Sequence, residues 1–131
     1  EETPLLSKSD RIANADRVIA IGRAAVDAKT VELAEELARK LGAKIGVTRP
    51  LTDHPKFNGE DQIGQSGNTI APKLLINLGI HGAVQYTTGI GNAELVVSIN
   101  KDPEAPIFDH SDYSYIGDSA SFLEGFLKVV Q

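Results

Sequence analysis

The chain has 131 residues, of which 41% are hydrophobic and 24% are charged, and these values are typical of one compact globular domain, residues 1–131. It contains no cysteine, which excludes disulfides, thiolate metal sites and cysteine nucleophiles. The formal net charge of −5 argues against nucleic acid as a partner, and no apolar run approaches the ~20 residues of a membrane-spanning helix, so we expect no membrane insertion.

Short apolar runs of strand length alternate along the chain with segments of helical periodicity. The first run, residues 17–22, is almost continuously apolar and ends in glycine, as expected for a buried strand. In residues 30–41 apolar side chains recur on one helical face, with Thr30 predicted as the N-cap and Gly42 as the C-terminal stop. Further strands are predicted at residues 43–47, 74–78, 95–99 and 113–116.

The second half of the chain contains two further helix signals. A short helix is predicted from about Gly82, shortly after the strand that ends at residue 78. The last helix is predicted to begin with a capping box at residues 121–124 (SFLE). Buried apolar strands joined by helices predict an α/β fold, a Rossmann-like doubly wound parallel sheet with helices on both faces.

Ligands of open parallel sheets bind outside the carboxyl ends of the strands, and this rule selects the candidate site. The polar segment 50–68, rich in glycine and proline, has the length of a functional loop. Because the strands are predicted to be parallel, the residues that follow them converge on one edge of the sheet. These residues are Gly22-Arg23, Thr48-Arg49, the segment 79–86 (GIHGAVQY), Asn100 and Asp118-Ser119.

Each of these signals also has a purely structural interpretation. The dinucleotide fingerprint of three spaced glycines is absent, so the turn 79–82 (GIHG) either approaches a phosphate or simply joins a strand to a helix. Arginines are most often surface residues, so Arg23 and Arg49 do not indicate function by themselves. Ordinary turns or helix starts would also explain residues 65–67 (QSG), residues 100–103 (NKDP) and Asp118.

No hydrolytic or metal chemistry is indicated. His54, His81 and His110 are spread over loops without metal-ligand spacing. No serine lies in a nucleophile-elbow sequence, and Asp102 and Glu104 are not marked as a glycosidase pair. We therefore predict no catalytic residues and no metal site.

Several blocks of the chain resemble the signature of electron transfer flavoprotein alpha subunits. Residues 74–100 are similar to the family's strand, Gly-Ile-Ser-Gly-Ala-Ile-Gln-His turn and following strand, and residues 100–108 (NKDPEAPIF) continue the likeness. Residues 62–67 (QIGQSG) match the block that the family writes Gln-Val-Gly-Gln-Thr-Gly. Gly22-Arg23 and Thr48-Arg49 occupy the places of two family arginine sites. The resemblance runs from about residue 16 to the end and identifies the C-terminal domain of such a subunit, with the family's N-terminal domain absent from this chain.

The resemblance implies FAD, bound in an extended conformation. Arg49 and Ser66 would approach the isoalloxazine ring, with Ser66 Oγ near flavin N5, and Tyr86 would lie near the N1–C2=O edge of the ring. His81 stands where the family has serine, Tyr86 where it has histidine and Ser66 where it has threonine. Tyr86 bears on redox tuning, because tyrosine offers a hydrogen bond but no positive charge near neutral pH.

The remaining implied contacts lie along the rest of the cofactor. Backbone N–H groups at residues 81–85 would wrap the pyrophosphate and ribityl chain. Asn100, Asp118 and Ser119 would face the adenosine half, and Arg23 the phosphates or adenine. The full implied cofactor-binding set is Arg23, Thr48, Arg49, Ile63, Gly64, Gln65, Ser66, His81, Gly82, Ala83, Val84, Gln85, Tyr86, Asn100, Asp118 and Ser119.

The implied function is that of an electron carrier and not of an enzyme. FAD would relay electrons between flavin dehydrogenases and a downstream acceptor, in a heterodimer with an electron transfer flavoprotein beta subunit. The expected location is the cytoplasm, or the mitochondrial matrix in a eukaryote. The first residues, 1–4 (EETP), show no signal-peptide pattern and the chain has no methionine, so we expect a fragment or a processed chain. The alternative function is a module of the same fold that binds NAD or another nucleotide, or docks a partner, without a redox role.

Overall fold

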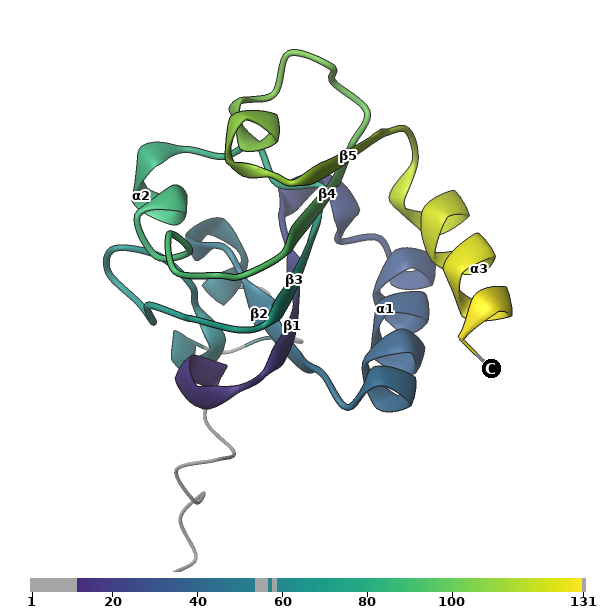
Figure 1. Ribbon diagram of the computed structural model, residues 1–131, viewed down its shortest axis with the longest axis horizontal. Helices are drawn as coiled ribbons and strands as arrows, with labels where there is room; N and C mark the ends of the chain where they lie inside the picture. The colour runs from purple at the N-terminus through teal and green to yellow at the C-terminus, as the bar shows by residue number, and fades with distance from the viewer. Residues whose placement is uncertain (1–11, 54–56, 58, 131) are drawn as a thin grey trace, which may run out of the picture.

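A five-stranded, all-parallel sheet forms the centre of the molecule (Figure 1). The computed structural model describes residues 12–53, 57 and 59–130. The strand order is β2-β1-β3-β4-β5. The fold class predicted from the sequence is thereby confirmed, with each strand within one residue of its predicted ends. The strands are β1 (Arg17–Ile21), β2 (Lys44–Val47), β3 (Leu74–Leu78), β4 (Val96–Asn100) and β5 (Tyr113–Ile116), and the helices are α1 (Ala28–Leu41), α2 (Val84–Thr87) and α3 (Ser119–Val129).

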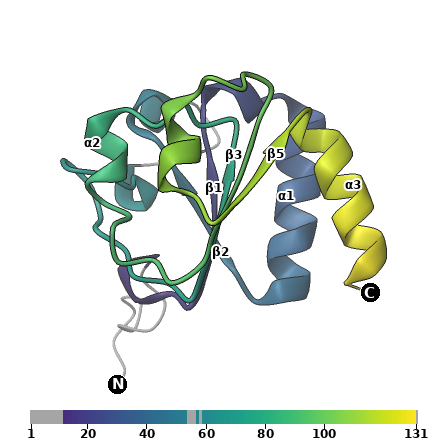
Figure 2. The same ribbon diagram turned by 45° about the horizontal axis from the view of Figure 1, so that its top comes forward.

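The two faces of the sheet are covered differently, as Figure 2 shows. α1 and α3 pack side by side on one face, which we call the helical face. The other, which we call the loop face, is covered by the four-residue helix α2, the 3₁₀ helix Pro106–His110 and the segment 59–73. Helices therefore lie on both faces as predicted, but only the helical face carries long ones.

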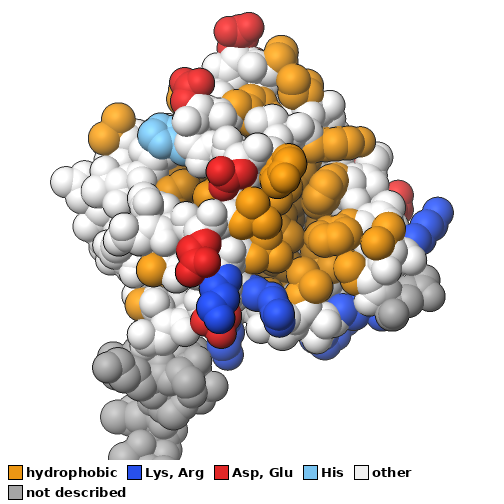
Figure 3. Space-filling view, in the orientation of Figure 1, with side chains coloured by type: hydrophobic (Ala, Val, Ile, Leu, Met, Phe, Trp, Pro, Cys, Tyr) orange, Lys and Arg blue, Asp and Glu red, His pale blue; other side chains and the backbone are white. Residues whose placement is uncertain are grey.

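Strand alternation divides the core into two clusters, one on each face. On β1, Ile19 and Ile21 pack with α1 on the helical face, whereas Val18 and Ala20 pack on the loop face. The helical-face cluster is aliphatic around Leu37 and extends to partly buried aromatic side chains of α3. Hydrophobic side chains also gather on the surface beside α3 (Figure 3).

Both long helices begin at an aspartate, and here the predicted caps were wrong. α1 starts at Ala28 because Asp27 accepts a hydrogen bond from the Thr30 backbone N–H, so Thr30 lies inside the first turn. α3 starts at Ser119 because Asp118 accepts from the Ser121 N–H in the same way. A carboxylate three residues before a helical N–H forms a charge-assisted cap, and this displaces the predicted hydroxyl caps by three residues. Gly42 ends α1 as predicted, in the left-handed conformation at φ 68°.

The strand order places a switch point between β1 and β3. From β1 the chain crosses the helical face through α1 to reach β2, whereas from β3 it crosses the loop face through α2 to reach β4. Connections that leave neighbouring strands in opposite directions open a crevice at their carboxyl ends. Among the described residues, no helix is long and apolar enough to cross a membrane.

Candidate functional site

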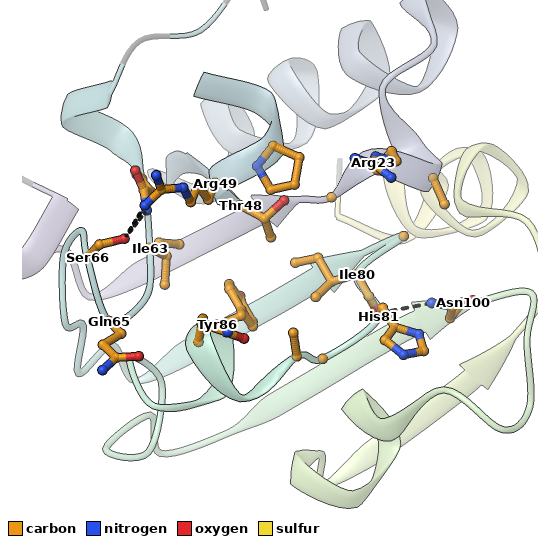
Figure 4. Close-up of a pocket in the computed structure, with 18 of the residues that line it drawn as sticks. Arg23, Thr48, Arg49, Ile63, Gln65, Ser66, Ile80, His81, Tyr86 and Asn100 are labelled. Carbon is orange, nitrogen blue, oxygen red and sulfur yellow. Dashed lines mark hydrogen bonds between the residues drawn. The ribbon is translucent and has the colours of Figure 1, made fainter. Parts of the chain in front are cut away.

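A cavity of about 850 Å³ opens at this switch point (Figure 4). Its walls are the residues that follow β1, β2, β3 and β4, together with the loop in which the Ile63 N–H donates to the Val47 carbonyl at the end of β2. The volume is within the range of small-molecule and cofactor sites. The lining residues are Gly22, Arg23, Ala24, Thr48, Arg49, Pro50, Gln62, Ile63, Gln65, Ser66, Gly79, Ile80, His81, Gly82, Ala83, Gln85, Tyr86, Asn100 and Asp102.

Most of the predicted cofactor-binding residues lie at this cavity. All of them line it except Gly64, Val84, Asp118 and Ser119. Val84 is 73% exposed on α2, and Gly64 packs against the backbone of Gln85 behind the lining loop. Asp118 caps α3 outside the cavity, where the N–H of Ser121 lowers the pKa of its carboxyl.

Seven lining residues do not belong to the implied cofactor-binding set. Each lies within two residues of a predicted position in the chain, and Gln62 opens the QIGQSG segment that resembles the family. Spacing rules select single side chains, whereas a turn exposes several consecutive residues to the same cavity. The seven residues are Gly22, Ala24, Pro50, Gln62, Gly79, Ile80 and Asp102.

The turn after β3 is held by two hydrogen bonds that orient its peptide groups. Asn100 Nδ2 donates to the Ile80 carbonyl at 2.9 Å, and the Ile107 N–H donates to the His81 carbonyl at 2.8 Å. In a trans peptide the N–H points opposite to the C=O, so the N–H groups of His81 and Gly82 point away from these two anchors. Neither N–H has a protein acceptor within the described part of the chain. The turn can therefore donate to an anion.

Glycine is required in this turn. Gly82 has φ 101°, and a Cβ there would lie 2.4 Å from the Ile107 nitrogen. Gly79 has φ 63°, and a Cβ there would lie 2.7 Å from the Ala25 nitrogen. The turn is thus pressed between its two neighbours, and its conformation is one that side chains rarely adopt.

On the opposite wall, Ser66 is the acceptor for two donors. Arg49 Nη1 and Gln62 Nε2 each donate to Ser66 Oγ at 3.1 Å. With both oxygen lone pairs engaged, the hydroxyl hydrogen is left for an acceptor outside this cluster. Arg49 also brings a positive charge to the cavity, as does Arg23, while Asp102 brings one negative charge.

The two walls are joined to each other. The Gln65 N–H donates to the Gln85 carbonyl at 2.7 Å, which ties the segment 62–67 to α2. Gly64 allows this approach: it has φ 134°, and a Cβ there would lie 2.7 Å from the Gln85 oxygen. Movement of one wall is therefore coupled to the other.

Tyr86 lines the cavity, but its hydroxyl is used elsewhere. The side chain is 5% exposed, and its hydroxyl donates to Asn77 Oδ1 inside the sheet. Burial raises the pKa of this phenol far above its ordinary value. In this structure the hydroxyl hydrogen is directed to Asn77, and the hydrogen bond to a flavin edge that the resemblance implied stays a prediction.

Comparison with known proteins places the chain among flavoproteins. Residues 11–91 match the family model of the "Electron transfer flavoprotein FAD-binding domain". FixB of Rhizobium meliloti is 43% identical over 118 residues, covering 90% of this chain and 33% of that protein. The electron transfer flavoprotein subunit alpha of Paracoccus denitrificans is 40% identical over 120 residues, covering 90% of this chain and 39% of that protein.

A further relative carries a different name. The LctC subunit of a lactate dehydrogenase (NAD(+),ferredoxin) of Acetobacterium woodii is 38% identical over 120 residues, covering 92% of this chain and 29% of that protein. The chain therefore spans about a third of the length of the curated relatives that it matches.

Proposed function

The chain belongs to the FAD-binding domain family of electron transfer flavoprotein alpha subunits, and from this premise we propose that it binds FAD and carries electrons. The observation that carries the proposal is the pairing of two walls at one cavity, an anion-binding turn after β3 and the Arg49–Ser66 pair after β2. When bound, FAD supplies one- and two-electron redox chemistry, and the protein supplies binding, orientation and electrostatics.

The residues at the cavity fit FAD in shape and charge. The lining residues follow four neighbouring strands, which at ~4.8 Å per strand span about 14 Å, so the site suits an elongated dinucleotide. The N–H groups of His81 and Gly82 would donate to the pyrophosphate, and no excess of lysine or arginine is needed for this. Asn100 donates to the Ile80 carbonyl, and the N–H of Ala24, next to Arg23, donates to the Gly79 carbonyl, so both residues adjoin the turn and would contact the adenosine half.

The isoalloxazine ring would lie against the other wall. Arg49 and Ser66 would approach it, with Ile63 and Gln65 beside them. Because Ser66 Oγ already accepts from Arg49 and Gln62, its hydroxyl would act as a donor and would favour a ligand atom that accepts. Oxidised flavin N5 is such an atom. The Arg49 charge would stabilise negative charge on the ring.

A matched pair of variants tests the assignment of Ser66. Ser66→Thr keeps the hydroxyl and Ser66→Ala removes it. We expect the threonine variant to keep the FAD affinity and absorption spectrum of the parent chain, and the alanine variant to lose affinity by about tenfold, in line with one hydrogen bond to a ligand. Equal spectra and affinities in all three proteins would separate Ser66 from the flavin.

We further propose that the chain works as part of a longer assembly. The relatives are about three times its length, and this supports a single domain that operates with further domains and with an electron transfer flavoprotein beta subunit. Flavin dehydrogenases would donate electrons to it. We propose a carrier and not a catalyst of substrate turnover, and the relatives named as electron transfer flavoproteins support this.

The second candidate is a nucleotide-binding or docking module without a redox role. The turn at residues 79–82 favours it, because backbone N–H groups recognise phosphate and not the flavin ring. Equilibrium dialysis of the purified chain against FAD, NAD and ADP distinguishes the two functions. We expect the chain to bind one FAD in preference to NAD, with flavin absorption bands, and more tightly when a beta subunit is added. Preference for NAD would contradict the electron-carrier assignment and favour the second candidate.

A further inference from the structure

We propose that a chain of hydrogen-bonded polar side chains, running from the buried Tyr86 to the half-buried Ser111 under the loop face, positions the turn at residues 79–82. The proposal rests on the proposed function for the identity of the ligand, but the contacts that support it are independent of FAD. None of its inner members, Asn77, Ser98 and Ser111, lines the cavity. They would act on the site through the backbone.

The chain of contacts is continuous from one side of the loop face to the other. Tyr86 donates to Asn77 Oδ1, and Asn77 Nδ2 donates to Ser98 Oγ at 3.1 Å. The hydroxyl oxygens of Ser98 and Ser111 are 2.6 Å apart, and Ser111 Oγ lies 2.7 Å from the Ile107 carbonyl oxygen. Asn77 and Ser98 are both 0% exposed and are paired in register on the adjacent strands β3 and β4.

The direction of every hydrogen bond follows from its last acceptor. The Ile107 carbonyl can only accept, so the single hydroxyl hydrogen of Ser111 goes to it. Ser98 must then donate to Ser111, and Asn77 must present its NH₂ group to Ser98 and its oxygen to Tyr86. All donors therefore point the same way, from α2 toward Ile107. Each side chain has only the next one in the series as the acceptor for its hydrogen.

The last member of this chain is joined directly to the turn. The Ile107 N–H donates to the His81 carbonyl, the bond that aims the Gly82 N–H. A Cβ on Gly82 would lie 2.6 Å from the Ile107 Cα, so the two backbones are in contact. Displacement of Ile107 would therefore tilt the peptide groups that are available to an anion.

A purely structural role explains these residues poorly. Central parallel strands are ordinarily apolar, as Val18 and Ala20 of β1 are on the same face. A buried polar group adds little net stability even when it is paired, and it is costly when its partner is lost. The two buried polar residues on β3 and β4 are therefore better explained by the position that they impose on Ile107.

Ser111 provides the test, because threonine and valine have nearly the same shape but differ in the hydroxyl. The dissociation constants of FAD and of ADP are measured for the parent chain, Ser111→Thr and Ser111→Val. We expect Ser111→Val to raise the dissociation constants of FAD and ADP by the same factor of about ten, since both ligands carry the pyrophosphate. Ser111→Thr should bind both ligands as the parent does. Ser114→Val, at an exposed position on β5, is the control and should bind both ligands as the parent does.

The outcomes separate this inference from the proposed function. Equal affinities in the threonine and valine variants, or a loss for FAD without a loss for ADP, would overturn the inference. If the parent binds ADP but not FAD, the proposed function is wrong. The ADP affinities of the Ser111 variants then still test the inference. Ser111→Ala, which cannot overpack the site, replaces Ser111→Val if that variant does not fold, with the same expected loss. Binding of neither ligand by the parent overturns both.

Discussion

The helical face and the loop face of the sheet are built from the same strands but by different means. On the helical face, two long helices cover an aliphatic cluster around Leu37, and no lining residue of the cavity comes from either helix. On the loop face, short helices and loops cover a cluster that includes the polar chain from Tyr86 to Ser111, and the cavity opens at its edge. The comparison indicates that the helical face carries the larger hydrophobic cluster, whereas the site lies at the edge of the loop face.

Leu37→Ala would produce the largest effect and tests the helical face. Leu37 is 0% exposed between α1 and the sheet, and removal of such a side chain costs about 2–5 kcal/mol of unfolding free energy. We expect the FAD affinity of the folded fraction to remain unchanged. Chemical denaturation and ligand titration measure the two quantities. Val129→Ala, at a side chain that is 78% exposed, should change neither.

Gly82→Ala should have the opposite pattern of effects from Leu37→Ala, because it should change FAD affinity more than stability. The substitution places a Cβ 2.4 Å from the Ile107 nitrogen at a residue with φ 101°, which costs about 1–3 kcal/mol of strain or shifts the turn. We expect FAD affinity to fall by about tenfold or more. Gly91→Ala is the matched control, because a Cβ there meets nothing within 4 Å. If the two variants bind FAD equally, the turn is not part of the site.

Arg49→Ala would sharpen the comparison at the other wall. Loss of a charge-assisted contact to the flavin removes about 1–3 kcal/mol, and about 1.4 kcal/mol corresponds to roughly 60 mV in a one-electron couple. The potential of the bound flavin should fall in Arg49→Ala, with Arg49→Lys intermediate because the planar guanidinium is lost. Redox titration decides this. Arg39→Ala, on α1 of the helical face, should leave the potential unchanged; a fall there too would point to a general charge effect.

Alkaline titration would test how completely the loop face encloses Tyr86. Burial raises the pKa of Tyr86, whose side chain is 5% exposed. The raised pKa contributes stability that is fully present below the ordinary tyrosine value of about 10 and is lost as the pH rises above it, by about 1.4 kcal/mol per pH unit. Tyr86 should therefore ionise only on unfolding, which the difference in phenolate absorbance between the parent chain and Tyr86→Phe reports. A Tyr86 signal that appears while the protein is still folded would show that the phenol is accessible.

Asp118→Ala would give the smallest effect and separates a cap from a cofactor contact. Loss of this N-cap should lower the stability by about 1 kcal/mol through α3. The hydrogen bond from the Ser121 N–H lowers the pKa of Asp118, so its contribution is present above the ordinary aspartate pKa and is lost as the pH falls below it. FAD affinity should not change. Weaker FAD binding at unchanged stability would indicate that Asp118 contacts the adenosine half of FAD.

How much of this could be predicted from the sequence differs between the two faces as well. The strands and the edge at which the cavity opens followed from local patterns, because apolar runs and terminal glycines are signals within a few neighbouring residues. The sequence did not predict the cap at Asp27, because this carboxylate lies three residues before Thr30, the predicted N-cap, and outside the apolar periodicity that marks the helix.

The polar chain could not be predicted at all. Asn77 and Ser98 lie within apolar runs that were assigned correctly as strands, but their partners are 9 to 21 residues away in the sequence. For the same reason the hydrogen bond from Tyr86 to Asn77 could not be predicted, and the role of Tyr86 toward a flavin stays a prediction. Its departure from the family's histidine was visible in the sequence, whereas the hydrogen bond that occupies its hydroxyl depends on the fold.

The two residues that anchor the turn at residues 79–82 also determine how long a segment must be to retain the site. Asn100 and Ile107 both lie beyond residue 91, the last residue that the family model matches, as do β4, β5 and α3. A piece that ended at residue 91 would keep most of the cavity-lining residues and lose both contacts that aim the turn. The segment most readily recognised by sequence is therefore shorter than the segment that can be transplanted into another protein, and a graft of this site would have to extend through the 3₁₀ helix Pro106–His110.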